Sequence, residues 1–411
     1  MKEKSGFIWN TLGSLIYSFL NAILLIFCTR LNGTEIAGIF SICYATGCIL
    51  NAIGDMGIRI FQVTDTNRKY KFEDYLCARI FSVILMLMVG VVFVFINGYT
   101  NEKLFICLVL IGIRVVDNFG ESFQAEFQLN GRLDRAGKAL LYRNILEIIS
   151  FALIDIFTKN IYMSFLAMLI TSVIILILYD YKITNKDNKI KFKIDYKNIK
   201  QIIKECFPLG ISTLISMYVI NAVKYAIDRY GDNTMQTYFN VLYMPTFVIN
   251  LISILIMKPL LKPFGEYWNN KEYKKFMKMI IAIFAILIIM TSIIEIGAII
   301  IGIPILGFIY AIDLSQYKLQ LFLLILSGLF YALSTVMFYA LGTIRKQKYA
   351  TIGYILSAII AYPLSNILVK RYSILGATVS SVLIMLTLFL VLTFLFIFAY
   401  KKEKNKKIME E

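Results

Sequence analysis

Histidine is absent from this 411-residue chain, and its absence removes a large part of enzyme chemistry. Without imidazole there is no histidine general base, proton relay or metal ligand. The sequence also lacks a GxxxxGK(S/T) segment, so the chain contains no P-loop ATPase of its own. Its six cysteines lie in or beside apolar runs without CxxC spacing, a pattern typical of buried small side chains. We therefore expect no bound metal or organic cofactor, and no enzyme.

Long polar stretches are also missing, and no segment of more than about 25 residues has the composition of a soluble domain. Hydrophobic residues make up 59% of the chain and the mean hydropathy is +0.73, which indicates an all-α integral membrane protein. One span needs roughly 20 helical residues. We predict twelve spans, the first of them retained and not cleaved as a signal peptide. They lie near residues 6–29, 36–58, 78–97, 104–128, 141–158, 161–181, 206–227, 235–257, 277–299, 319–342, 349–369 and 375–400.

The basic residues are distributed unevenly between the predicted connections. Of the 42 Lys and Arg residues, 33 fall in seven segments that would all lie on one side of a membrane. An excess of Lys and Arg on alternate loops marks the cytoplasmic side, so we predict that both termini are cytoplasmic. The same distribution argues against nucleic acid as a partner for the net charge of +16 and favours anionic membrane lipids. The segments are Met1–Ser5, Arg59–Arg79, Arg132–Arg143, Lys182–Lys204, Lys258–Lys278, Arg345–Lys348 and Lys401–Lys407.

The longest polar connection falls midway along the chain and predicts two six-helix lobes. We expect an N-terminal lobe at 1–181, a basic cytoplasmic linker at 182–205, a C-terminal lobe at 206–400 and a basic cytoplasmic tail at 401–411. Because six is even, both lobes would enter the membrane from the same side, related by a pseudo-two-fold axis normal to it. Pro304 and two nearby glycines lead us to expect an external turn or interfacial segment at 303–317.

Several predicted spans carry polar residues at helical spacing. Those of the fourth span occupy an arc of about 80° on one face of a helix, and a second stripe follows the second span. Shorter stripes occur in the first, fifth and seventh spans. Ions at the centre of a membrane cost at least about 2.5 kcal/mol, so these faces are expected to meet each other or line a hydrated cavity between the lobes. The fourth span contributes Arg114, Asp117, Glu121, Gln124 and Gln128, and the second contributes Asn51, Asp55, Arg59 and Gln62. The first span contributes Asn10, Ser14, Tyr17 and Asn21. The fifth span contributes Arg143, Glu147 and Ser150, and the seventh contributes Asn221, Lys224 and Asp228.

A simpler explanation stays open for some of these residues. Arg114 with Asp117, and Lys224 with Asp228, are spaced so that they can neutralise each other within one helix. Residues close to the cytoplasmic ends, such as Arg59 and Arg143, can extend to lipid headgroups. Glu295, alone in the ninth span, lies near the external surface or is a proton site.

In its span count, basic middle loop and charged early helices, the chain resembles the multidrug/oligosaccharidyl-lipid/polysaccharide exporter superfamily, and within it the polysaccharide-biosynthesis (Wzx-type) flippases. The resemblance covers essentially the whole chain. One position departs from the family pattern, since Ala311 stands where the family often has Gly. The segments that carry the resemblance are Arg30–Gly38, Gly54–Gly57, Gln128–Arg132, Ile303–Leu306, Tyr310–Asp313 and Tyr372–Ala377.

The resemblance implies flipping of undecaprenyl-diphosphate-linked oligosaccharide repeat units across the bacterial cytoplasmic membrane by alternating access, coupled to a gradient of H⁺ or Na⁺. Polysaccharide polymerase or assembly proteins would be candidate partners. A drug or metabolite exporter of the same superfamily is the main alternative, followed by a membrane glycan polymerase or ligase. We predict substrate-binding roles for Arg59, Arg114, Lys224, Gln124, Gln128 and Arg143, and ion-coupling or charge-balancing roles for Asp55, Asp117, Glu121 and Asp228.

Overall fold

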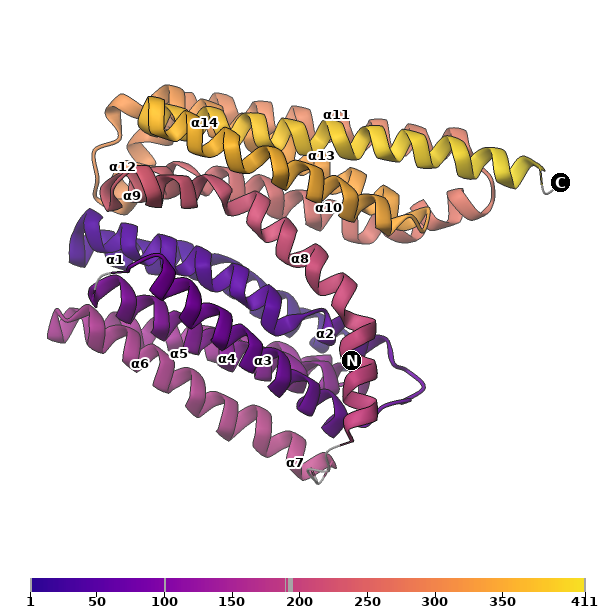
Figure 1. Cartoon of the computed structure of the whole chain (residues 1–411), viewed down its shortest axis with the longest axis horizontal. Helices are drawn as coiled ribbons and strands as arrows, with labels where there is room; N and C mark the ends of the chain where they lie inside the picture. The colour runs from indigo at the N-terminus through magenta and orange to yellow at the C-terminus, as the bar shows by residue number, and fades with distance from the viewer. Residues whose placement is uncertain (1, 100, 189, 191–194, 410–411) are drawn as a thin grey trace. The chain divides into compact units, whose positions relative to one another are not determined.

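The computed structural model of the chain describes residues 2–99, 101–188, 190 and 195–409 (Figure 1). Every regular element in these ranges is helical and none is a strand, which confirms the predicted all-α class. The chain divides into two compact units, Met1–Met217 and Tyr218–Glu411, which we call the first lobe and the second lobe. The division falls inside a helix, downstream of the predicted linker at 182–205. Residues 189 and 191–194 of that linker lie outside the described ranges.

The first lobe begins with a long helix, α1 (Lys2–Asp55), that is interrupted at Gly33. Gly33 has φ 84° and ψ 176°, a conformation that ends a helix and that glycine adopts without steric penalty. The break falls between the first two predicted spans. The elements that follow are α2 (Ile58–Thr64), α3 (Phe72–Ile96), α4 (Asn101–Leu129), α5 (Leu133–Thr158), α6 (Ile161–Ile175), the π-helical turn η1 (Leu176–Tyr181) and α7 (Lys182–Asn188).

Helices α1 and α5 pack with their backbones unusually close together. A Cβ added to Gly13 would lie 2.6 Å from the carbonyl oxygen of Gly137, and one added to Gly137 would overlap the backbone at Trp9 and Asn10. Small residues allow this close approach, which is a common way for membrane helices to associate. The contact positions α5, and with it Arg143, against the rest of the first lobe.

The turn between α2 and α3 is fixed by Asp65. Its carboxylate accepts hydrogen bonds from the backbone N–H groups of Lys69 (2.9 Å) and Tyr70 (3.0 Å) and from the Tyr75 hydroxyl (2.9 Å). Partial burial raises the pKa of Asp65, but these three donors outweigh it and the pKa lies below its ordinary value. The ionised form of Asp65 therefore stabilises the turn.

The first turns of α8 (Tyr196–Tyr230) are part of the first lobe and not a free linker. Ile199, Ile202, Ile203 and Cys206 recur at helical spacing, and they pack on a cluster of α1, α2 and α3 residues. The Asn198 side chain also donates a hydrogen bond to Asp74 of α3 (3.1 Å). We expected a polar connection at 182–205, but α7 and the start of α8 occupy most of it, because its apolar residues share one face. The cluster consists of Met56, Ile58, Tyr70, Tyr75 and Ala78, with Phe61 and Leu85 beside it.

The second lobe contains the rest of α8 and the helices that follow it. Its last helix, α14, is broken at Ser373 (φ 52°, ψ −132°), between the last two predicted spans. Helix α13 packs against α10, α11 and α14. The elements are α9 (Asn233–Leu242), α10 (Met244–Asn269), α11 (Tyr273–Gly297), the π-helical turn η2 (Ala298–Gly302), α12 (Ile303–Tyr310), the short 3₁₀ turn η3 (Ser315–Tyr317), α13 (Lys318–Thr343) and α14 (Gln347–Met409).

The segment at 303–317, expected to be a turn or interfacial segment, is helical over its first half. Pro304 occupies the first turn of α12, where its missing N–H removes no essential hydrogen bond. The chain turns only at Ala311, which is left-handed (φ 55°) and caps α12. The position at which the family often has Gly is therefore one that demands a left-handed residue.

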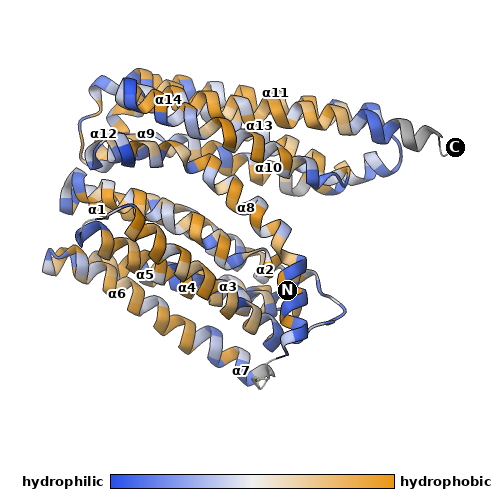
Figure 2. Ribbon diagram, in the orientation of Figure 1, coloured by the Kyte–Doolittle hydropathy of each residue, from blue (hydrophilic) through white to orange (hydrophobic). Residues whose placement is uncertain are grey.

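Seven of the described helical segments are long and apolar enough to cross a membrane, or eight if the bent pair Asn233–Leu242 and Met244–Met257 is taken as one span. Two of the seven, Ser5–Asp55 and Gln347–Lys404, contain the breaks described above. Figure 2 shows hydrophobic residues along the helices and hydrophilic ones concentrated towards many of their ends. The protein is a multi-pass membrane protein; the count of twelve spans and the cytoplasmic termini stay predictions.

Candidate functional site

The polar stripe predicted on the fourth span lies mostly inside the first lobe. In α4, Arg114, Asp117 and Gln124 are buried and Glu121 is half-buried, whereas Gln128 is exposed at the end of the helix. The helix contacts α1, α2, α3, α5 and α6, so side chains from several helices reach its polar face. The 3.6-residue period thus placed four of the five residues correctly on one inward face.

A chain of buried ion pairs joins α4, α5 and η1. Arg114 Nη1 lies 2.9 Å from Asp117 Oδ2, and Arg143 Nη1 lies 3.8 Å from the other oxygen of Asp117. Arg143 Nη2 donates to the carboxylate of Asp180. Two arginines and two carboxylates therefore alternate, with Asp117 between the two guanidinium groups. Each of the four side chains is at least 89% removed from solvent.

Arg114 also has aromatic and polar neighbours from α1. Its Nη1 donates to the Tyr17 hydroxyl (3.3 Å), Nη2 lies 3.7 Å from Cys48 Sγ, and the guanidinium carbon lies 4.6 Å from the centre of the Tyr44 ring. A guanidinium over an aromatic face gains further stabilisation once it is desolvated. The predicted stripe on α1 thus contributes through Tyr17, and Tyr44 adds a contact that spacing alone did not indicate.

Gly120 provides the space that Arg143 needs. A Cβ at this position would overlap the guanidinium nitrogens and carbon of Arg143, so no larger residue fits on this face of α4 without moving the arginine. Glu147, one turn further along α5, is buried, and its Oε1 has no hydrogen-bond partner among the described residues. The site is therefore tight around Arg143, and it leaves Glu147 Oε1 and Asp180 Oδ1 without a hydrogen-bond partner among the described residues.

A third buried arginine, Arg79 of α3, ties α1 to α4. It donates to the Gly54 carbonyl (2.8 Å), Asn118 Oδ1 (2.9 Å) and Ser122 Oγ (3.0 Å), and it lies 3.3 Å from Asp55 Oδ1. The Arg79 side chain is fully buried, whereas that of Asp55 is 22% exposed. The predicted residue Asp55 therefore has a defined partner, Arg79, which is held by groups from α1 and α4.

Two other predicted residues lie near this cluster. Glu121, on the same face of α4 as Asp117, lies within the electrostatic influence of Asp55, Arg59, Arg79 and Asp117. Arg59 is half-buried at the start of α2, and Gln62, three residues later, is buried and donates to the Ser122 carbonyl (3.2 Å). The structure thus brings Asp55, Arg59, Glu121 and Asp117 into one electrostatic environment.

Lys224 and Asp228 belong to the second lobe, near the end of α8. Both are half-buried, and Lys224 Nζ lies 5.8 Å from the centre of the Tyr243 ring. Asn221 on the same helix is buried. Their predicted roles in binding and charge balance remain predictions, as do those of the first-lobe residues.

Sequence reasoning missed two members of the networks, Arg79 and Asp180. Arg79 was counted in the basic segment Arg59–Arg79, but its side chain is buried inside α3. The acidic first turn of α3, in which Asp74 accepts a hydrogen bond from the Lys71 backbone N–H (3.1 Å), marks the start of the helix, so Arg79 lies two turns within it. Asp180 is the first acid after a long apolar run and lies in η1, a π-helical turn of the kind that is frequent at functional sites.

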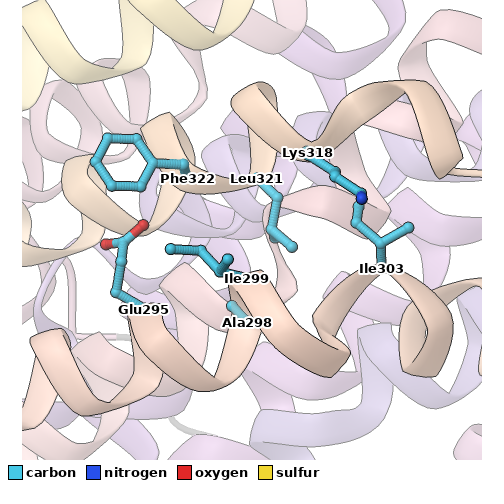
Figure 3. Close-up of a pocket in the computed structure, with 7 residues that line it drawn as sticks. All are labelled: Glu295, Ala298, Ile299, Ile303, Lys318, Leu321 and Phe322. Atoms are coloured by element: carbon cyan, nitrogen blue, oxygen red, sulfur yellow. The ribbon is translucent and has the colours of Figure 1, made fainter.

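A small cavity in the second lobe is lined by Glu295 (Figure 3). Its volume is about 40 Å³, and it is lined by apolar residues of η2, α12 and α13 together with Lys318. Glu295 is half-buried and its Oε1 has no hydrogen-bond partner among the described residues. Figure 3 shows Glu295 and Lys318 at opposite ends of the cavity. The cavity has room for little more than water.

The fold is similar to that of solved membrane transporters. A multidrug resistance transporter of the MATE family in an inward-facing conformation matches 95% of this chain and 96% of its own, with a TM-score of 0.72 at 14% identity. The lipid II flippase MurJ in an inward closed conformation matches 93% of this chain and 87% of its own, also with a TM-score of 0.72, at 16% identity. At these identities the likeness concerns the fold.

The chain belongs to the polysaccharide biosynthesis protein family, whose model matches residues 4–263. A curated relative, the capsular polysaccharide biosynthesis protein CapF of Staphylococcus aureus, is 25% identical over 194 residues. The match spans 46% of this chain and 48% of the relative, so it covers about half the length of each protein. The predicted membership of the superfamily and of its polysaccharide branch is confirmed.

Proposed function

We propose that the protein flips undecaprenyl-diphosphate-linked oligosaccharide repeat units across the bacterial cytoplasmic membrane by alternating access. Membership of the polysaccharide biosynthesis family and the fold shared with a lipid II flippase support this proposal. The observation that carries it is the buried chain of Arg114, Asp117, Arg143 and Asp180. A passive scaffold or an enzyme with an external active site has no need of such ions inside a membrane lobe.

Arg114 is our candidate for the first contact with the substrate diphosphate. A guanidinium binds phosphate oxygens through two parallel hydrogen bonds, and Arg114 at present donates to only one carboxylate oxygen, of Asp117. We expect the diphosphate to compete with Asp117 for Arg114, with Arg59, Arg143 and Lys224 supplying further positive charge. Gln124 and Gln128 would donate hydrogen bonds to the sugars.

Asp117 then provides a route for ion coupling. Because Asp117 faces both Arg114 and Arg143, binding of H⁺ or Na⁺ to its carboxylate would weaken both pairs and free the arginines for an anionic substrate. Release of that ion would restore the pairs and expel the substrate. Asp55, Glu121 and Asp228 would balance the remaining charge.

The test is complementation of a strain that lacks this gene but retains the enzymes of glycan assembly. We expect completed lipid-linked oligosaccharide to accumulate in the deletion strain, protected from glycosidase added outside spheroplasts. The wild-type gene and Arg132→Gln, which changes a half-exposed arginine paired with Asp134, should restore access. Arg114→Gln should reduce it at least tenfold at equal expression, since a hydrogen bond between charged groups is worth about 1.5–3 kcal/mol. External exposure without polymer in the deletion strain would instead indicate a polymerase or ligase.

A multidrug exporter is the second candidate, because the match to the MATE transporter equals the match to the flippase in TM-score. The two functions differ in their phenotype. Loss of an exporter sensitises cells to cationic dyes and leaves lipid-linked sugars normally distributed. Dye sensitivity of the deletion strain with unchanged glycan topology would favour the exporter.

A further inference from the structure

The second lobe has a pair of adjoining hollows at the end where α10 finishes and α14 begins. Their volumes are about 490 and 320 Å³, and they share Asn269, Thr343 and Arg345. The larger one joins an apolar wall, with Leu261 and Phe338, to this polar rim. Volumes of this size and lining are typical of small-ligand sites. The hollows lie entirely within the second lobe and contain none of the residues of the charge network.

Two glycines line the larger hollow without any packing reason to be glycine. A Cβ added to Gly265 of α10 or to Gly342 of α13 would meet no atom within 4 Å. Glycine in a helix is less stable than alanine, and elsewhere in this protein helical glycines such as Gly13 and Gly137 serve close helix contacts. At 265 and 342 the missing side chains instead leave the hollow open.

Arg345 stands at the rim with its guanidinium unengaged. Its side chain makes no hydrogen bond or ion pair with any described residue, and it is exposed. Its backbone is left-handed (φ 57°) and caps α13, with the Lys346 N–H donating to the Leu341 carbonyl (2.8 Å). Glycine is the usual residue at such a cap. Position 345 thus has an arginine in a backbone conformation that favours glycine, whereas positions 265 and 342 have glycines although alanine would fit.

The remaining charges leave the rim positive. Glu403 of α14 is the one carboxylate among the residues that line the two hollows, and it is neutralised by Lys346 at 2.8 Å. Trp268, which lines the smaller hollow, is held in place by ring contacts with Phe276 and Tyr400. The turn that follows α10 and the turn between α13 and α14 lie at the same end of the second lobe as the basic C-terminal segment (Figure 1). That end is predicted to face the cytoplasmic headgroups.

We propose that this hollow is a binding site for an anionic lipid phosphate. Arg345 would hold the phosphate, Asn269, Thr343 and Gln347 would donate hydrogen bonds to its ester oxygens, and Leu261 and Phe338 would contact the first methylene groups of the chain. An amphipathic hollow beside a headgroup layer suits a lipid better than a soluble anion, because one wall is apolar. The site does not depend on the proposed flipping, since a structural phospholipid and a carrier lipid present the same group.

The test uses the full-length protein in nanodiscs and the fluorescence of Trp268, which lines the smaller hollow. The chain has two tryptophans, so Trp9→Phe leaves Trp268 as the reporter. Phosphatidylglycerol, a polyprenyl diphosphate or inorganic phosphate is titrated into a phosphatidylcholine background. We expect a saturable change with at least one of the two lipids at about one lipid per protein.

Two variants separate charge from space. Arg345→Gly removes the charge and suits the left-handed backbone, so we expect binding to weaken about tenfold or more with an unchanged or raised melting temperature. Gly265→Leu fills the hollow and should also abolish saturation. Gly297→Leu is its matched control, because Gly297 also has open space around it but lies in α11, outside the hollow.

Each outcome bears on the proposal. Saturation by phosphatidylglycerol identifies a membrane phospholipid as the ligand, and saturation by the polyprenyl diphosphate alone identifies the carrier. Wild-type titration of Arg345→Gly would overturn the site. Loss in Arg345→Gly with wild-type behaviour of Gly265→Leu would reduce it to surface electrostatics, and an equal response to inorganic phosphate would exclude a lipid ligand.

Discussion

The two lobes differ in the kind of polar side chains that they bury. The first lobe buries charged side chains from α3, α4, α5 and η1, whereas the buried polar residues described in the second lobe are all uncharged. In the second lobe most are serines and threonines, such as Ser334, Ser365 and Ser380, which donate to the carbonyl four residues earlier in their own helix. The charged residues buried in the first lobe are Asp74, Arg79, Arg114, Asp117, Glu126, Arg143, Glu147, Asp155 and Asp180.

This difference determines how the helices depend on one another. A hydroxyl that bonds within its own helix is satisfied wherever that helix lies. A buried guanidinium such as Arg79 is satisfied only when α1, α3 and α4 are correctly assembled. The first lobe therefore contains the buried charged residues, and its stability depends on the correct assembly of several helices. We expect substitutions of buried polar residues to destabilise the first lobe more than the second.

The largest effect on folding is expected from Arg79→Met. It leaves Asp55 Oδ1 and Asn118 Oδ1 without their partner, and breaking a buried pair in this way costs about 3–5 kcal/mol. Thermal unfolding of the purified protein should shift down strongly. The matched variant in the second lobe is Gln236→Met, because Gln236 is buried and both its amide atoms have no partner among the described residues. If Gln236→Met proves equally damaging, the contrast between the lobes is wrong.

A smaller effect is expected from Gly120→Ala. The new methyl group would collide with the Arg143 guanidinium and move it away from Asp117 and Asp180. Overpacking of this kind costs about 1–3 kcal/mol, and we expect flipping to fall along with stability. The control is Gly112→Ala, where an added Cβ would meet Leu169 only at an ordinary 3.4 Å. Equal melting temperatures and activities for both variants would contradict the role of Gly120.

The smallest effect is expected from Asp65→Asn, which acts at the edge of the first lobe. The pKa of Asp65 is lowered in the folded protein, so its ionised form stabilises the fold above the ordinary carboxylate pKa. The stability difference between wild type and Asp65→Asn should be largest near neutral pH and disappear as the pH falls through the lowered pKa of Asp65. Melting temperatures recorded from neutral pH to about pH 3 test this directly. A difference that grows on acidification would contradict the assignment.

Periodicity found the inward face of α4 because a polar stripe at 3.6-residue spacing is a property of one helix. It could not find the partners of that face, since Arg79 and Asp180 come from other helices and pairing between helices leaves no trace in local spacing. Arg79 was left out of the candidate site for the same reason, because it stands at the end of a basic segment that was assigned to the membrane surface. The left-handed conformation of Arg345 could not be predicted either, because Arg345 is not the glycine that usually marks such a turn.

The order of the ion-pairing residues along the chain bears on how the first lobe is made. Two partners of Arg79, Gly54 and Asp55, precede it in the chain and are synthesised first. Two others, Asn118 and Ser122, follow it and are synthesised later. Arg143 likewise follows Asp117 and precedes Asp180. An arginine inserted alone at mid-helix costs about 2.5–3.5 kcal/mol, and a carboxylate already synthesised offsets part of that cost. During biosynthesis, Arg79 and Arg143 would thus each enter the bilayer after one of their partners has been synthesised. The remaining partner would be added with a helix that is synthesised later.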